Sequence, residues 1–357
     1  MRSKQVARFT FTGTRKMEDE GFYLSPIFGR ELGALGHSYS PLNSANLLIN
    51  INHNWKALKR FNCSDSIFPK YRVLLRLEPK CVYPYQYESQ LESQYDLIYT
   101  PGSIDHEKGI FIRWPYAYEE NPNQSTTIPV DLKLIVDKNF SRGLYSQSEW
   151  NSRPIFCSLI AANKVSSDGS GNYGYRRGVV KSVIHEDFKT YGALWDYNLF
   201  LRLKNVIALI KFNYQASRRF DFRPLCGALL TRYLGTNGTI KNKHSVIEHS
   251  KFSLIVENSN DYVSEKIFDA LIGGSIPIYL GPNLIPLGIP GNVYFQAPTD
   301  PANLLRFLKD LDRTEIEERV HSIRRFIQSP DFFEWEANKV YRLIVKDLNS
   351  KLGVKND

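Results

Sequence analysis

Short runs of apolar and β-branched residues alternate along the chain with longer segments of mixed polarity. The short runs predict strands, and they occupy residues 5–13, 46–51, 71–77, 95–102, 109–115, 155–162, 252–256, 275–280 and 292–296. The mixed segments predict helices, and they occupy residues 26–35, 175–185, 198–219, 264–271, 301–310, 314–328 and 331–348. Strands and helices that follow one another in this way indicate an α/β fold.

The length of 357 residues predicts about two domains. Turn-rich sequence between residues 121 and 153 indicates the boundary. We therefore expect a first domain at residues 1–150, a second at 151–330 and a helical segment at 331–357. Apolar residues on helical spacing in this last segment predict core packing or a brace across to the first domain, rather than a membrane anchor; they are Phe332, Trp335, Val340, Ile344 and Leu348.

One stretch, Lys251 to Pro282, reads as a complete βαβ unit. Ser264 is the predicted N-cap of its helix, and Glu265 and Lys266 follow in the first turn. The end of the first strand and the start of the helix form the edge at which open α/β sheets bind ligands. A lysine there opposes the helix dipole. It is either a solvated surface lysine or the partner of a phosphate, with Glu265 left to accept hydrogen bonds from sugar hydroxyls.

Arg176 and Arg177 start another helix and again indicate an anionic partner, the alternative being an exposed arginine pair. Glu78 follows the strand at residues 71–77, so a parallel sheet would place it at the ligand-binding edge. Apolar and aromatic neighbours there could raise its pKa and suit it to act as a general base. An ordinary loop glutamate is the alternative.

Two familiar motifs carry less weight. Residues 169–174 spell GxGxxG, with Glu186 or Asp187 as a ribose carboxylate, but the loop lies too far from the preceding strand for a dinucleotide fingerprint. Asp310 and Asp312 form a DxD pair at a helix end, where acidic residues serve as caps. No histidine or cysteine spacing indicates a metal site, and we expect none.

The net charge of +9 fits an anionic ligand or an anionic membrane surface. No zinc finger, RNA-binding signature or dense basic run is present, so a nucleic-acid partner is not expected. The N-terminus has no apolar segment of a secretory signal, and no apolar run reaches the length of a membrane span. Together with four cysteines without disulfide or zinc spacing, these features predict a cytoplasmic protein that contacts a membrane at most peripherally.

Residues 252–282, FSLIVENSNDYVSEKIFDALIGGSIPIYLGP, closely resemble the donor-binding signature of the α1,3/4-fucosyltransferases, glycosyltransferase family 10. Val256 stands where that pattern has an aromatic residue before Glu257. The resemblance extends more loosely from about residue 155 to the C-terminus. In the first half it rests on residues 77–79 and 95–96. The absence of a signal and of a span makes the chain more similar to bacterial or viral members than to Golgi ones.

The resemblance implies a GT-B fold, with two Rossmann-like domains facing each other across a cleft. The first domain would bind the acceptor, the second would bind GDP-fucose, and residues 331–357 would brace the two. It implies inverting transfer of L-fucose to a hydroxyl of an acceptor glycan, α1,3 or α1,4 to GlcNAc, with no tightly bound cofactor and no obligatory metal. The acceptor would be an oligosaccharide or a glycolipid.

The resemblance also implies residue roles. Asn258 and Tyr262 would contact the diphosphate, Glu265 the ribose and Lys266 a phosphate. The arginine that stabilises the departing diphosphate maps to Arg176, with Arg177 as the second choice. Asn163 belongs to the donor site, and the general base maps to Glu78.

Three alternatives stay open at this stage. One is the same fold using a different GDP-sugar, and a second is a catalytically silent nucleotide- or glycan-binding protein. The third is an NAD-dependent enzyme, which rests on the GxGxxG loop alone.

Overall fold

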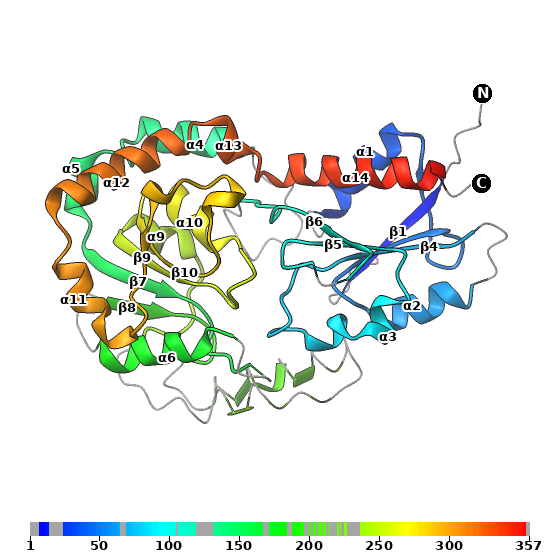
Figure 1. The fold of residues 1–357 in the computed structure, drawn as a ribbon, viewed down its shortest axis with the longest axis horizontal. Coiled ribbons are helices and arrows are strands. Elements are labelled where there is room, and N and C mark those ends of the chain that lie inside the picture. The colour runs from blue at the N-terminus through cyan, green and yellow to red at the C-terminus, as the bar shows by residue number, and fades with distance from the viewer. Residues whose placement is uncertain are drawn as a thin grey trace.

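The computed structural model describes residues 7–13, 24–64, 69–104, 106–118, 131–166, 171–183, 188–195 and 236–354, together with individual residues between 200 and 226. Two α/β domains lie side by side, each built on its own sheet (Figure 1). The predicted helix at 198–219 lies largely outside the described residues, and Glu186 and Asp187 lie entirely outside them. Among the described residues, no helix is both long enough and apolar enough to cross a membrane.

The first domain holds a six-stranded parallel sheet in the order β2-β1-β3-β4-β5-β6. Its strands are β1 (Arg8–Gly13), β2 (Ser38–Tyr39), β3 (Leu47–Ile51), β4 (Tyr71–Leu75), β5 (Leu97–Thr100) and β6 (Gly109–Phe111). Its helices are α1 (Leu24–Ala34), α2 (Trp55–Asn62) and α3 (Ser89–Glu92), with the 3₁₀ turn η1 (Pro84–Tyr87). Five of the six strands form at the predicted places, whereas β2, α2 and α3 were not predicted.

Both faces of this sheet are covered, because alternate residues of each strand enter different cores. Leu47, Ile49 and Val73 pack in the core beneath α1, whereas Leu48 and Leu74 pack with α2 on the opposite face. Strands buried on both faces require nearly continuous apolar sequence. This requirement explains why the strands were visible in the sequence as short apolar runs.

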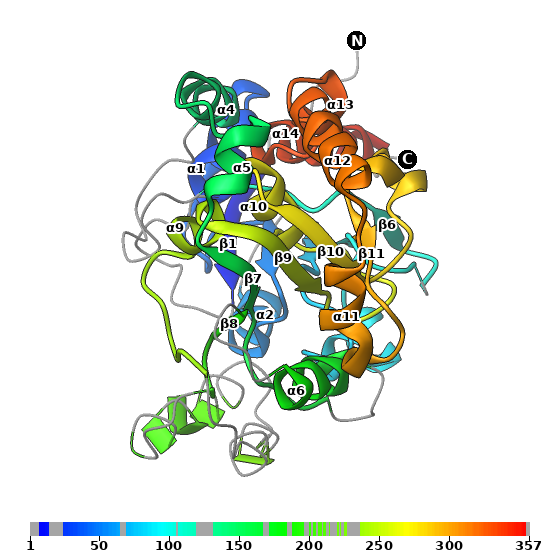
Figure 2. The same cartoon turned by 90° about the vertical axis from the view of Figure 1, so that its left-hand side faces the viewer.

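The second domain holds a five-stranded parallel sheet in the order β11-β10-β9-β7-β8 (Figure 2). Its strands are β7 (Ile155–Ile160), β8 (Phe188–Tyr191), β9 (Ser250–Val256), β10 (Ile276–Leu280) and β11 (Phe295–Gln296). Its helices are α4 (Leu132–Ser141), α5 (Gln147–Ser152), α6 (Tyr173–Ser182), α9 (Lys243–Glu248), α10 (Lys266–Ile272), α11 (Leu304–Lys309), α12 (Arg313–Phe326) and α13 (Pro330–Phe333), with 3₁₀ turns η2 (Ile285–Leu287), η3 (Gly291–Val293) and η4 (Pro301–Asn303).

The segment predicted to be a turn-rich boundary contains two helices of the second domain. Leu132, Ile135 and Val136 of α4, and Trp150 of α5, are buried in that domain's core. Asp131 and Ser146 cap these helices with their side chains. Polar capping residues therefore made the segment look like a loop, and the second core begins about twenty residues before the predicted division at 150.

The C-terminal segment crosses from one domain to the other. It forms two helices, α13 and α14 (Ala337–Val354), where the sequence predicted one. The helix breaks where the backbone of Tyr116 pairs with that of Trp335 and Ala337, at 2.8 and 2.7 Å. Trp335 is buried in the second core, whereas Val340 and its neighbours in α14 pack on the first sheet beside α1 (Figure 1).

Candidate active site

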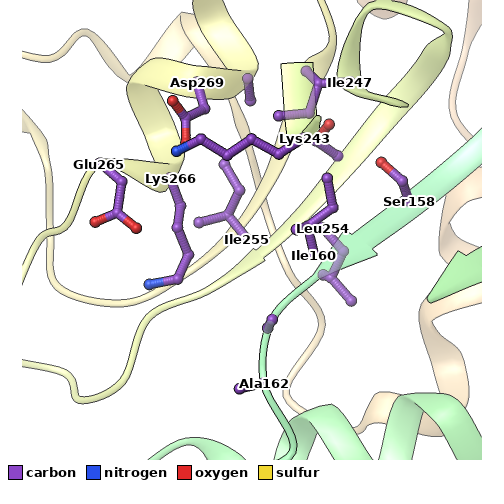
Figure 3. Close-up of a pocket in the computed structure, with 13 residues that line it drawn as sticks. Ser158, Ile160, Ala162, Lys243, Ile247, Leu254, Ile255, Glu265, Lys266 and Asp269 are labelled. Carbon is purple, nitrogen blue, oxygen red and sulfur yellow. The ribbon is translucent and has the colours of Figure 1, made fainter. Parts of the chain in front are cut away.

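Two adjoining cavities lie at the C-terminal edge of the second sheet. The first, of about 210 Å³, reaches between β7, β9 and α10 and contains Ser158, Lys243, Ser253 and Asp269 (Figure 3). The second, of about 180 Å³, lies between the two domains and contains Glu78, Trp114, Lys164, Arg176, Asn258 and Tyr262. Glu265, Lys266, Ala161 and Ala162 line both cavities. One elongated ligand could therefore occupy the pair.

Glu257 organises the turn between β9 and α10. Its carboxylate is fully buried and accepts hydrogen bonds from the backbone N–H and the hydroxyl of Ser264, at 2.9 and 2.7 Å. Lys266 Nζ forms an ion pair with the same carboxylate at 3.0 Å. The prediction of Ser264 as N-cap is wrong: its hydroxyl is held by Glu257, and α10 begins at Lys266 with Glu265 in the N-cap position.

Lys266 lies where the sequence placed it, at the start of α10 and beside both cavities. Its ammonium contacts Glu257 and also donates to the hydroxyl of Ser264 at 2.7 Å. The dipole penalty of a lysine in the first helical turn is thus offset within the protein by a buried carboxylate. A phosphate contact for Lys266 stays a prediction.

Glu265 directly precedes α10, lies next to Lys266 and lines both cavities (Figure 3). Burial alone would raise the pKa of this carboxyl, but the positive charges of Lys266, Lys243 and Lys164 outweigh burial and lower it. Glu265 is therefore a carboxylate at neutral pH. Such a group accepts hydrogen bonds, as the predicted ribose contact requires.

Arg176 is buried in α6, and its guanidinium reaches the second cavity. It donates to the carbonyl oxygen of Val256 at 2.5 Å, to Asn258 Oδ1 at 2.8 Å and to the carbonyl oxygen of Ala162 at 3.4 Å. Burial lowers the pKa of this arginine, and nearby Tyr173 opposes that change. Arg177 is not among the residues that line the cavities, and its Nη1 donates to the carbonyl oxygen of Lys164 at 2.7 Å.

The remaining predicted donor residues occupy different positions. Asn258 lines the second cavity and holds Arg176. Tyr262 also lines it, but its hydroxyl donates across the domain boundary to the carbonyl oxygen of Leu77. Asn163 is buried and does not line either cavity, and its backbone N–H donates to the carbonyl oxygen of Ala193 at 3.0 Å. Their contacts with a donor stay predictions.

Glu78 enters the second cavity from the first domain, three residues beyond the end of β4. Its carbonyl oxygen accepts hydrogen bonds from Gln86 Nε2 at 2.8 Å and from the hydroxyl of Tyr87 at 3.0 Å. Beneath that loop, Arg76 pairs with Glu92 at 2.6 Å and stacks on the Tyr87 ring. These contacts fix the backbone that presents the Glu78 carboxylate to the second domain.

His53 belongs to the same support. Its backbone N–H donates to Gln86, and its Nδ1 lies 2.8 Å from the Tyr95 hydroxyl. Burial lowers the pKa of His53 from 6.5 to about 4. Between these values the unfolded chain binds a proton that the folded chain does not. The stability that depends on neutral His53 is complete above pH 6.5 and is lost as the pH falls toward 4.

When the pH is lowered from 7.5 to 5.0, we therefore expect the free energy of unfolding to fall by about 2 kcal/mol because of His53. Urea unfolding at both pH values would measure this. His53→Asn should remove that part of the pH dependence, whereas the exposed His321→Asn should retain it. Equal pH dependence in the wild type and His53→Asn would contradict the assignment.

Sequence reasoning did not single out Lys164, Lys243 and Trp114, which line the cavities. Lys164 follows the end of β7, Lys243 starts α9, and Trp114 follows β6. Lys164 was detectable, because it lies four residues beyond β7, a strand whose C-terminal end faces the ligand edge. Lys243 pairs with the buried Asp269 at 2.6 Å, a contact between residues 26 positions apart that no local pattern reveals.

Gly171 of the glycine-rich loop and the DxD pair have structural explanations, whereas residues 169 and 170 lie outside the described residues. A Cβ at Gly171 would approach the Tyr173 ring to 2.9 Å and the carbonyl oxygen of Asn258 to 3.0 Å, so close packing requires glycine there. Asp312 caps α12 in a capping box, and Asp310 ends α11. Within the part of the chain that the structure describes, no cluster of three His, Cys, Asp or Glu side chains could hold a metal ion.

The fold is that of the GT-B glycosyltransferases: two parallel-sheet α/β domains with a site between them. HepE of Anabaena, solved in complex with UDP and glucose, is similar over 96% of this chain and 100% of its own, at 11% identity and a TM-score of 0.53. An alpha-glucosyltransferase solved with UDP-glucose and DNA containing an abasic site is similar over 97% of this chain and 100% of its own, at 10% identity and a TM-score of 0.51.

The second domain carries the family relationship. Residues 225–345 match the model of glycosyltransferase family 10 (fucosyltransferase), C-terminal part. The 4-galactosyl-N-acetylglucosaminide 3-alpha-L-fucosyltransferase 9 of Bos taurus is 35% identical over 83 residues, which are 21% of this chain and 23% of the relative. The human protein of that name is 35% identical over 81 residues, 20% of this chain and 22% of its own. Residues 225–345 of this chain are thus similar to the C-terminal part of the family 10 fucosyltransferases, and the chain matches less than a quarter of the length of these relatives.

Proposed function

We propose that this protein transfers L-fucose from GDP-fucose to a hydroxyl of an acceptor glycan, with inversion at the sugar C1. One observation carries the proposal: Glu78 of the first domain shares a cavity with Arg176, Glu265 and Lys266 of the second. The last two residues lie in the part of the chain that matches the fucosyltransferase family. A carboxylate on one side of a cavity and cations on the other suit a transfer between two bound substrates.

The two cavities suit the parts of a GDP-sugar. A nucleoside in the first cavity would place its ribose near Glu265, at the junction, and its diphosphate in the second, near Lys266 and Arg176. The acceptor hydroxyl would approach from the first domain and give its proton to Glu78 as its oxygen attacks C1. The C1–oxygen bond to the β-phosphate breaks, and the electron pair leaves with GDP, whose charge the cations stabilise.

The acceptor is proposed to be an oligosaccharide or a glycolipid, fucosylated α1,3 or α1,4 on GlcNAc. The relatives in cattle and humans are named for transfer to 4-galactosyl-N-acetylglucosaminide. Their similarity to this chain covers about a fifth of its length. Acceptor recognition would instead fall to the first domain, where Trp114 offers an aromatic face beside Glu78.

A donor panel tests the proposal. In thermal unfolding, GDP and GDP-fucose should stabilise the protein, by about 2.7 kcal/mol at one hundred times Kd. GDP-mannose, UDP-glucose and NAD serve as comparisons, and stabilisation by NAD or UDP-glucose without stabilisation by GDP would overturn the proposal. Stabilisation by GDP-mannose but not by GDP-fucose would show that the donor sugar is mannose rather than fucose. Because side-chain cations carry the leaving-group charge in this proposal, transfer should also persist in EDTA.

A further inference from the structure

The two cations predicted from the sequence to meet the donor phosphates are already occupied by protein groups. Arg176 Nη2 donates to the Val256 carbonyl oxygen at 2.5 Å and to Asn258 at 2.8 Å. Lys266 contacts Glu257 and Ser264, at 3.0 and 2.7 Å. Either residue could still attract an anion, but each would have to share or leave contacts that hold the turn after β9.

Lys164 is the third cation that lines the second cavity. Its backbone is fixed on both sides, since its N–H donates to Ala162 at 3.0 Å and its carbonyl oxygen accepts from Arg177 at 2.7 Å. Within the described residues, its ammonium makes no hydrogen bond or ion pair. The backbone of Lys164 is therefore fixed, while its ammonium can still donate hydrogen bonds to a ligand.

Lys164 shares its cavity with two carboxylates, Glu78 and Glu265, and with the two other cations. Burial lowers the pKa of its ammonium, and the charges of Arg176 and Lys266 lower it further, whereas Glu78 acts in the opposite direction. A buried cation is costly unless it is paired and hydrogen-bonded. A diphosphate entering the cavity would bring negative charge and several acceptor oxygens to a site where three cations gather.

We propose that Lys164 is a direct contact to the donor diphosphate. This inference rests on the proposed function and adds a residue to its donor site. As the bond between C1 and the β-phosphate oxygen breaks, the electron pair moves to that oxygen, and the Lys164 ammonium stabilises the charge. Without a donor, the charge of Glu78 raises the pKa of Lys164, and the charge of Lys164 lowers the pKa of Glu265. A bound diphosphate gives Lys164 an anionic partner of its own and leaves Glu78 to accept the acceptor's proton.

Calorimetric titration of the full chain with GDP and with guanosine tests this role. Lys164→Ala should weaken GDP binding about 10- to 100-fold, the range for a lost charged hydrogen bond, and should leave guanosine binding unchanged. Lys164→Arg should retain GDP affinity within a few-fold, because it keeps the charge. Lys309→Ala, an exposed lysine at the end of α11, removes the same charge and should bind GDP like the wild type.

The outcomes are distinguishable. If the wild type binds GDP and Lys164→Ala binds it equally well, Lys164 does not contact the diphosphate, although the proposed function stands. Equal weakening of GDP and guanosine binding would also overturn the contact, because it indicates a distorted site. If the wild type does not bind GDP, both proposals fail. Circular dichroism checks folding, and Lys164→Gln, which keeps the side-chain length more closely, replaces the alanine variant if that variant is unfolded.

Discussion

Replacement of Glu78 by glutamine is expected to slow fucosyl transfer at least about 100-fold, the scale for loss of a general base. Glutamine keeps the shape of the side chain but cannot accept the acceptor's proton. GDP affinity should change little, because the nucleoside cavity belongs to the second domain. Initial rates with GDP-fucose and an N-acetyllactosamine acceptor, beside calorimetric GDP binding, would measure both quantities.

Glu107→Gln is a suitable control for this experiment. Glu107 is an exposed residue between β5 and β6 of the same domain and does not line either cavity. Its variant should transfer fucose at the wild-type rate. Undiminished transfer by Glu78→Gln would show that another group removes the proton. A parallel loss of GDP binding would show instead that the substitution disturbs the domain boundary.

The second large effect is expected on stability. Glu257→Gln should lower the free energy of unfolding by about 3 kcal/mol, the scale for breaking a buried ion pair by removing one partner. The fully buried carboxylate of Glu257 accepts from Ser264 twice and pairs with Lys266. A glutamine would turn an NH₂ group toward donors and leave Lys266 without its counter-charge. Urea unfolding of the variant measures the loss.

A matched substitution separates this effect from a general loss of charge. Glu248 forms an ion pair with Arg142 at 2.8 Å, and the Arg142 side chain is 49% exposed. The Glu248 side chain is 15% exposed, but an ion pair with one partner at the surface contributes little, so Glu248→Gln should cost less than about 1 kcal/mol. If the two variants are equally stable, the Glu257 cluster does not hold the start of α10 as proposed.

The overall architecture was predictable because its strands are short, apolar and buried on both faces. The βαβ unit of β9, α10 and β10 could be delimited to within a few residues, since apolar strands, the polar turn and Gly273 follow one another directly. The same continuity placed Glu265 and Lys266 at a ligand edge. Helices α2, α4 and α5 were not predicted, because they are short and polar at their ends. The break between α13 and α14 was not predicted either, because it depends on backbone hydrogen bonds with Tyr116, more than two hundred residues away.

The sequence alone determined that the βαβ unit of β9, α10 and β10 places the start of its helix at a ligand-binding edge. The local hydrophobic pattern and the polar turn between strand and helix are sufficient for this prediction. The tertiary structure decided which charges there are already paired. It joined Lys266 to Glu257, held Arg176 on the end of β9 and brought Glu78 into one cavity with Lys164. Hydrophobic periodicity is a property of neighbouring residues, whereas pairing and burial of charges depend on segments that only the folded chain brings together.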